Sequence, residues 1–555
     1  MRKFALLLAF LFSATVTTFA CTSFLVGKKA STDGSVFITY SMDSYGAFAR
    51  LTYYPAAKHP AGSMRRIVDG DTNHYLGMIP EAPETYAVMG QINEHQLSIM
   101  ETTFGGREEL VDTTGGIDYV SLMTLGLQRA RTAREAIKVM TSLVQEHGYY
   151  SSGESFSIAD PNEIWILEMI GKGVGEKGAV WVAVRIPDDC IACHANHSRI
   201  HHFDLKDTDN VMASDDVISF ARRKGFFKGE DKDFSFSKAY APADFGAIRY
   251  CDARAWSFYN KWVDGMDAYL EYAKGYDIEN QKPFPLYMKP KQKLSLKDVM
   301  TSMRDHYEGT YFDTQTDCSA GEGNAPYRPS PLSWKYNGKT YFNERPISTQ
   351  QAAASMVAQL RADMPNEIGG ILWWGNDEAN MISYSPIYCS ATAAPLCFDD
   401  PEASDVRFSW NSAFWVCNWV ANMTYPRYAQ LFPDVERVRE EVENSNIALQ
   451  PLVEKQALEI LKTQGHDAVC QFLTNVSAER AESMMQRWRN LGTYLIVKHN
   501  DMVVKREKDG RFEMTPDGIA APPVRPGFTE QYKAVIVKET ADKYLLPEQS
   551  NILIL

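Results

Sequence analysis

Residues 21–43 read CTSFLVGKKASTDGSVFITYSMD, and this stretch decides the fold. Residues 22–27 and 36–42 are rich in β-branched and aromatic side chains, which favour strands. Between them, residues 31–35 are turn-forming, with Asp33 and Gly34 at the centre. The pattern predicts a β-hairpin with Cys21 at the start of its first strand.

The twenty residues before Cys21 have the features of a secretory signal peptide. Arg2 and Lys3 are followed by an apolar run over residues 4–12, which is too short to span a bilayer. Residues 18–20 end in a small residue, Ala20. Cleavage after Ala20 would make Cys21 the first residue of an exported protein, periplasmic or extracellular, without a membrane span.

A cysteine directly after a signal peptide is also the acylation site of lipoproteins. Thr18 and Phe19 fit poorly where such signals usually place Leu and a small residue. A free N-terminal cysteine is therefore favoured, and a surface lipoprotein lipidated at Cys21 is the alternative.

The bulk composition indicates a large globular protein with an acidic surface. The chain has 555 residues, is 45% hydrophobic and carries a formal net charge of −13. This charge argues against nucleic acid as a partner. It leaves open a small substrate and a homo-oligomer.

Strand and helix patterns alternate along the chain. A second hairpin is expected over 86–92 and 97–103, then helices capped by Asp118 and Thr132, then strands at 155–159, 164–170 and 179–186. Further strands are expected at 370–374 and 381–384, whereas 205–300 has no assignable pattern. Stacked antiparallel sheets covered by helices, an α+β fold, fit this order.

From residue 434 the pattern becomes helical. Residues 435–461 and 478–495 are amphipathic, and Pro451 is expected to break or start a helix. We therefore divide the chain into a signal peptide (1–20), a main domain (21–425) and a mostly helical C-terminal appendage (426–555).

An N-terminal cysteine carries its own base. The α-amino group has a reference pKa of about 7.7–8, so a useful fraction of it is the free amine near neutral pH. That amine can take the thiol proton, and the thiolate can attack a carbonyl to form a thioester. No metal or cofactor is needed for this chemistry.

Several ordered motifs extend the pattern beyond Cys21: the opening residues 21–35, residues 93–97 (NEHQL), residues 101–103 (ETT), residues 160–168 (DPNEIWILE) and residues 194–196 (HAN). Together they resemble the dipeptidase A and secernin family of N-terminal-nucleophile (Ntn) hydrolases, which is related to penicillin V acylase and bile salt hydrolase. The resemblance implies the four-layer αββα sandwich of the Ntn hydrolases and the hydrolysis of dipeptides.

The resemblance also assigns roles to single residues. Cys21 matches the nucleophile, and Asp43 matches the aspartate that hydrogen-bonds its amine. Asn196 matches a side-chain donor to the oxyanion, and Thr103 falls at another oxyanion position, where its backbone N–H is the expected donor. Arg345 is the candidate for a supporting arginine.

One departure concerns the substrate. Acylase relatives have an arginine where this chain has Tyr40, which favours a short peptide over an acyl-amide of the penicillin V or bile salt type; an acylase is the alternative. A dipeptidase must bind a substrate ammonium, and Glu94, Glu101, Glu168 or Asp43 could supply the carboxylate.

The cysteines raise a separate question. Eight of the nine could pair and leave Cys21 free. Cys190, Cys193 and His194 form a C-x-x-C-H pattern, which is compatible with haem attachment, a metal site or a local disulfide.

Overall fold

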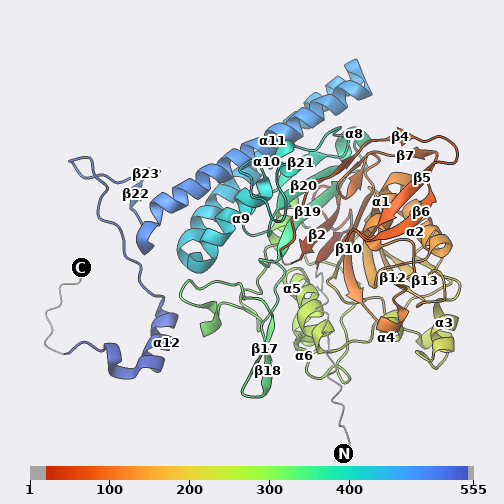
Figure 1. The fold of residues 1–555 in the computed structure, drawn as a ribbon, viewed down its shortest axis with the longest axis horizontal. Coiled ribbons are helices and arrows are strands. Elements are labelled where there is room, and N and C mark those ends of the chain that lie inside the picture. Colours follow the sequence, from red (N-terminus) through yellow and green to blue (C-terminus); the bar gives the residue numbers. More distant parts are fainter. Residues whose placement is uncertain (1–20, 45, 548–555) are drawn as a thin grey trace, which may run out of the picture.

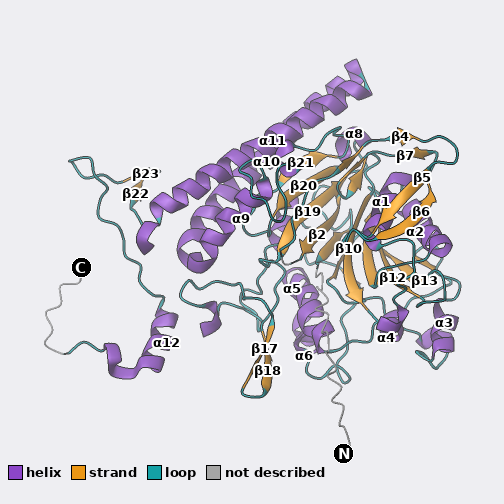
Figure 2. Cartoon of the chain, viewed as in Figure 1, coloured by secondary structure: helices purple, strands orange, loops and turns teal. Residues whose placement is uncertain are grey.

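A computed structural model describes residues 21–44 and 46–547, so the predicted signal peptide lies outside the described residues. Two antiparallel β-sheets form its centre (Figures 1 and 2). The seven-stranded sheet has the order β16 (Tyr287–Met288), β14 (Ile191–His194), β1 (Ser23–Val26), β2 (Val36–Asp43), β19 (Ala352–Leu360), β20 (Ile371–Asn376) and β21 (Ser385–Tyr388).

The eight-stranded sheet is built from the segment between β2 and residue 213. Its order is β15 (Val211–Ala213), β13 (Ala179–Ile186), β12 (Ile164–Gly171), β11 (Gly153–Ala159), β10 (Ser98–Gly105), β9 (Ile92–Asn93), β8 (Val88–Met89) and β3 (Tyr53–Tyr54). The two sheets pack face to face, with β1 and β2 against β10.

Helices α1 (Tyr119–Arg129) and α2 (Ala133–His147) cover the outer face of the eight-stranded sheet. Both begin at the predicted caps: Asp118 accepts hydrogen bonds from the N–H groups of Val120 and Ser121, and Thr132 accepts one from Glu135. Their apolar residues join those of the sheet in one buried cluster.

The other face of the seven-stranded sheet is also covered by helices. The larger ones are α5 (Ala253–Trp262), α7 (Leu296–Ser302), α9 (Ala413–Thr424), α10 (Tyr428–Gln464) and α11 (His466–Lys498). Figure 1 shows the long α10–α11 pair beside β20 and β21, opposite α1 and α2. The order of layers is therefore helix, sheet, sheet, helix.

The long helices differ from the predicted appendage. Ala457 of α10 and Trp488 of α11 belong to the same buried cluster as the central strands, so this pair forms a layer of the main body. Pro451 lies inside α10 and does not break it. It is exposed, where water can satisfy the carbonyl that a proline leaves without a donor.

Smaller elements surround this body. They are the helices α3 (Val217–Lys224), α4 (Phe236–Tyr240), α6 (Leu270–Lys274), α8 (Asn366–Gly369) and α12 (Glu530–Thr540), and the two-stranded pairs β4–β7 (Ala57–Lys58, Glu84–Thr85), β5–β6 (Met64–Val68, Tyr75–Pro80), β17–β18 (Ser333–Tyr336, Lys339–Phe342) and β22–β23 (Glu507–Lys508, Arg511–Phe512). None of the described helices is long and apolar enough to cross a membrane.

Candidate active site

Strand register sets the surroundings of Cys21. On one side of β1, the ladder ends where Ser23 pairs with His194 of β14, so Cys21 and Asn196 lie just beyond the same end of this strand pair. On the other side, Thr22 pairs with Ser41, which places Cys21 opposite Met42 and next to Asp43. Asp43 and Asn196 therefore flank Cys21 from opposite sides, although 153 residues separate them in sequence.

The thiol of Cys21 is buried between the two sheets. Its Sγ lies 3.7 Å from Tyr40 Oη and 3.5 Å from Glu101 Oε1, and Tyr40 Oη donates to the same carboxylate oxygen at 2.5 Å. Burial raises the pKa of the thiol well above its ordinary value, and the nearby carboxylates of Glu101 and Asp43 raise it further. Ionising this thiol therefore requires a base at the site.

Asp43 forms a buried ion pair with Arg345, whose Nη2 lies 2.7 Å from Oδ2. Ser41 donates to the other carboxylate oxygen, and Tyr307 Oη donates to the backbone carbonyl of Arg345 at 2.7 Å. Burial raises the pKa of Asp43 to about 6, while Arg345 opposes this shift. The structure thus brings the predicted Asp43 and Arg345 together beside Cys21.

Asn196 is fixed from two directions. Its Nδ2 donates to the carbonyl of Thr103 at 2.8 Å, and its Oδ1 accepts from Arg254 Nη2 at 2.9 Å. The residue has a positive φ of 62°, which asparagine tolerates better than most residues. Thr103 therefore contacts the site through its backbone carbonyl, while its hydroxyl donates to Glu154 at 2.8 Å.

Arg254 is a site residue that the sequence analysis missed. It is fully buried, and its Nη1 donates to the carbonyl of Cys21 at 2.7 Å and to Thr22 Oγ1 at 2.6 Å. It lies in α5, directly after a π-helix at Ala247–Asp252, and π-helical turns are frequent at functional sites. Residues 205–300 have no recognisable pattern in the sequence, so nothing there indicated this arginine.

Glu101 has a carboxylate neighbour. Glu101 lies on β10, and Glu154 lies on β11 opposite Thr103, so the two buried side chains stand diagonally on the same face of the sheet. Burial raises the pKa of both carboxyl groups, and the charge of Glu101 raises the pKa of Glu154 further, whereas Glu154 lowers the pKa of Glu101. The pair therefore holds a proton or requires a cation.

The structure places Glu168 in a structural role. Its carboxylate accepts from the hydroxyl of Ser198 at 2.5 Å and from the backbone N–H groups of Arg199 and Ile200. All these donors lie in the segment that follows Asn196. Glu168 therefore holds that segment against the eight-stranded sheet.

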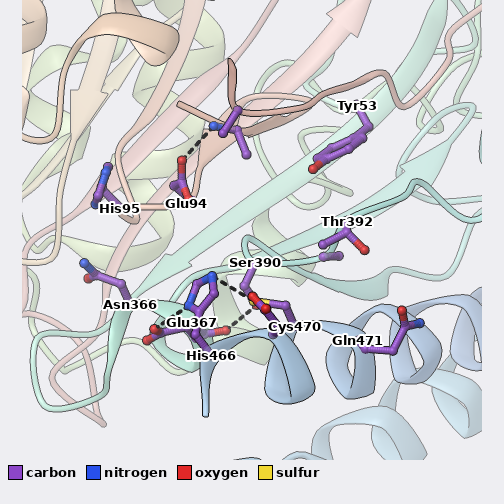
Figure 3. A pocket seen from close by; sticks show the side chains of 14 residues that line it. Tyr53, Glu94, His95, Asn366, Glu367, Ser390, Thr392, His466, Cys470 and Gln471 are labelled. Atoms are coloured by element: carbon purple, nitrogen blue, oxygen red, sulfur yellow. Dashed lines mark hydrogen bonds and ion pairs between the residues drawn. The ribbon is translucent and has the colours of Figure 1, made fainter. Parts of the chain in front are cut away.

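Glu94 lies in a separate cavity of about 460 Å3 (Figure 3). Its Oε1 accepts from the backbone N–H of Ala87 at 2.8 Å. Across the cavity, His466 lies 2.9 Å from Glu367 and 3.6 Å from the sulfur of Cys470. Cys21 and its neighbours are not among the residues that line this cavity.

The C-x-x-C-H segment is part of a buried strand. Cys190 directly precedes β14, and Cys193 lies within it. Extended backbone over three residues separates their Cα atoms by roughly 10 Å. A disulfide requires less than about 7 Å, which excludes the local bridge. All nine cysteines are free thiols in the structure, so the eight that could have paired do not.

Both ring nitrogens of His194 are occupied within the protein. Nδ1 lies 2.7 Å from Thr102 Oγ1, and Nε2 lies 2.7 Å from Ser157 Oγ. Burial and the charge of Arg199 lower the pKa of the ring to about 3, so it is neutral. These contacts join β14 to the eight-stranded sheet beside Asn196 and leave no nitrogen for a metal.

Comparisons with known proteins agree with a hydrolytic site. A probable dipeptidase of Salmonella dublin is 27% identical over 390 residues, which are 66% of this chain and 81% of that protein. Dipeptidase A of Lactobacillus helveticus is 25% identical over 430 residues, 74% of this chain and 82% of that protein. A probable dipeptidase of Latilactobacillus sakei is 26% identical over 475 residues, 81% and 91% of the two chains.

The site and these relatives define a cysteine-type peptidase. The sequence model of Peptidase family C69 matches residues 20–441. The chain belongs to peptidase family C69, as the motifs around Cys21 predict.

Proposed function

We propose that the protein is an exported dipeptidase whose nucleophile is the thiol of Cys21, freed as the N-terminal residue by removal of residues 1–20. The observation that carries this proposal is the convergence of Asp43, Asn196 and Arg254 on Cys21 at the strand register described above. The relatives named dipeptidase support the substrate class. The helix–sheet–sheet–helix layers support an Ntn-hydrolase fold.

The proposed reaction starts with proton transfer. The α-amine of Cys21 takes the thiol proton, and the thiolate sulfur attacks the scissile carbonyl carbon. The tetrahedral intermediate collapses, the C–N bond breaks, and the protonated amine returns the proton to the leaving amino group. Water then hydrolyses the thioester with the same amine as base, which releases the first amino acid and restores the thiol.

The neighbouring residues position this chemistry. Arg254 holds the carbonyl of Cys21 and the side chain of Asn196, so it fixes the nucleophile relative to the oxyanion donor. The side-chain amide of Asn196 is the proposed oxyanion donor, and loss of one such donor typically costs about 100- to 1000-fold in rate. Asp43 is held by Arg345 and is the proposed hydrogen-bond acceptor for the α-ammonium group of Cys21 itself.

Intact mass and activity of the mature protein test the proposal. We expect a mass that begins at Cys21 without an added acyl group, and dipeptide hydrolysis that falls by at least about 1000-fold in Cys21→Ala. Cys21→Ser is the matched control, because serine keeps the size and shape of the side chain and replaces only the sulfur. An acylated Cys21 would support the lipoprotein reading instead, and full activity of Cys21→Ala would exclude this nucleophile. Preference for penicillin V over dipeptides would support an acylase.

A further inference from the structure

Among the described residues, no cationic side chain forms an ion pair with Glu101 or Glu154 beside Cys21. Oε1 of Glu101 accepts from Tyr40, and Oε1 of Glu154 accepts from Thr103, but Oε2 of each is a buried acceptor without a donor among the described residues. The strongest influences on the pKa of either carboxyl are burial and neutral or acidic neighbours, none of them a cation. Buried carboxylates left like this are costly unless a cation or proton joins them.

The position of this pair relative to the thiol matches the dimensions of a substrate. In an α-amino acid the ammonium nitrogen lies about 2.5 Å from its own carbonyl carbon. A sulfur poised to attack that carbon is about 3–3.5 Å from it. A carboxylate that binds the ammonium must therefore lie within a few ångströms of Sγ, and Glu101 Oε1 lies at 3.5 Å.

The other candidates fit this requirement less well. Glu168 is saturated by Ser198 and backbone donors, and Glu94 lines the separate cavity. Asp43 is neutralised by Arg345. Glu101 and Glu154 thus combine closeness to the thiol with acceptor oxygens that still require a donor.

We propose that Glu101 and Glu154 form the subsite for the free α-ammonium of the substrate's first residue. This proposal rests on the dipeptidase function proposed above and deepens it, since it restricts cleavage to the bond after a residue with a free amine. It also gives Tyr40 a role. A neutral phenol orients Glu101 and leaves the negative charge for the ligand, whereas an arginine at this position would neutralise it.

The polar cluster continues from this subsite to the surface. Tyr119 is nearly buried and donates from Oη to Asp71 Oδ1 at 3.1 Å; burial raises the pKa of its hydroxyl, and the charges of Glu101, Asp71 and Glu154 raise it further. Asp71 lies in the turn between β5 and β6 and is exposed. A line of acidic and phenolic groups from solvent toward the thiol offers oxygen acceptors to the cationic end of a peptide.

Kinetics of the mature enzyme test the subsite. The substrates are a dipeptide with a free amine, its N-acetyl derivative and p-nitrophenyl acetate, which reports the reactivity of Cys21 without an ammonium. For the wild type we expect kcat/KM for the free dipeptide to exceed that for the N-acetyl form by at least about 100-fold. In Glu154→Gln, KM for the free dipeptide should rise about 10- to 100-fold, as expected for loss of a hydrogen bond to a charged group.

Ester hydrolysis separates recognition from reactivity. In Glu154→Gln, the fall in kcat/KM should be at least about 10-fold larger for the free dipeptide than for p-nitrophenyl acetate, because the ester has no ammonium to bind. Glu108→Gln, at an exposed position just after β10, is the matched control and should leave both activities unchanged. Equal cleavage of the free and N-acetyl dipeptides, or an equal loss of ester and dipeptide hydrolysis in Glu154→Gln, would overturn the subsite.

Binding to the inactive Cys21→Ala variant tests the subsite without turnover. We expect calorimetry to give a Kd for the free dipeptide at least about 10-fold below that of the N-acetyl form, and Glu154→Gln in the same background to remove this preference. Equal affinities would overturn the subsite. Selective binding without any dipeptide hydrolysis by the wild type would overturn the proposed function and leave the subsite standing.

Discussion

The carboxyl group of Asp43 makes the stability of the folded protein depend on pH. Burial raises the pKa of Asp43 from 3.8 to about 6 in the folded protein, despite the opposing charge of Arg345. The folded state therefore binds this proton more tightly than the unfolded chain. The stability that this proton contributes is fully present below pH 3.8 and is lost as the pH rises through 6.

The variant Asp43→Asn isolates this effect. As the pH rises from about 3.5 to 7, we expect the free energy of unfolding of the wild type to fall relative to the variant by about 3 kcal/mol, the value of the pKa difference. Urea unfolding at several pH values measures the difference. A difference that grows in favour of the wild type with rising pH would mean that Arg345 outweighs burial and lowers the pKa of Asp43.

Single residues near Cys21 were predictable where local motifs carry them. Cys21, Asp43 and Asn196 occupy short motifs next to strands, and strand register then brings them together. Arg254 and Glu154 were not predictable, because their positions near Cys21 arise only when α5 and β11 pack beside β1 and β10. For Glu101, the sequence supplied a candidate carboxylate, but the contact with the thiol crosses the two sheets.

At the scale of elements, residue patterns predicted the bounds of several strands, but they did not predict every strand of the two sheets. The strand at 179–186 has the predicted bounds, and β1 and β2 differ from prediction by a residue or two. The central strand β19 was missed because five of its nine residues are alanine or serine, which have little strand preference. Residues 381–384 are not a strand; β21 follows directly, at Ser385–Tyr388.

The packing of α11 on α9 gives a test at this scale. Gly492 lies in α11 where an added Cβ would stand 2.0 Å from the ring of Trp419 in α9, which also packs edge-on against Trp410. In Gly492→Ala overpacking costs about 1–3 kcal/mol and helix propensity gains about 1 kcal/mol, so we expect a net loss of up to about 2 kcal/mol in the free energy of unfolding. Thermal unfolding measures the change.

A control on the same helix separates packing from propensity. Asn475 is exposed on α11, so Asn475→Ala gains helix propensity without a steric conflict and should not lower the melting temperature. If Gly492→Ala is as stable as the wild type, α11 does not pack closely on α9. The helices α10 and α11 would then form an appendage, as the sequence predicts.

At the scale of the whole molecule, the layered body and the segment that follows α11 differ in how many of their side chains are buried. Helices α10 and α11 share the core of the seven-stranded sheet, whereas α12 buries none of its residues. Figure 1 shows the chain after β23 running away from the layers toward α12. An eleven-residue helix is marginal by itself in water, so α12 adds little to the stability of the body.

A chain that ends at Val524, and so lacks α12, tests this division. It keeps the bridge between Val504 and Val524 and the stacking of Tyr494 on Phe512. Because no side chain of α12 is buried, we expect the melting temperature to change by less than about 2 °C and kcat/KM for dipeptides to remain within about twofold of the full chain. A fall of more than about 5 °C, measured at matched concentrations, would mean that α12 is covered in solution, and a simultaneous loss of mass in size-exclusion chromatography would identify a second copy of the chain as what covers it.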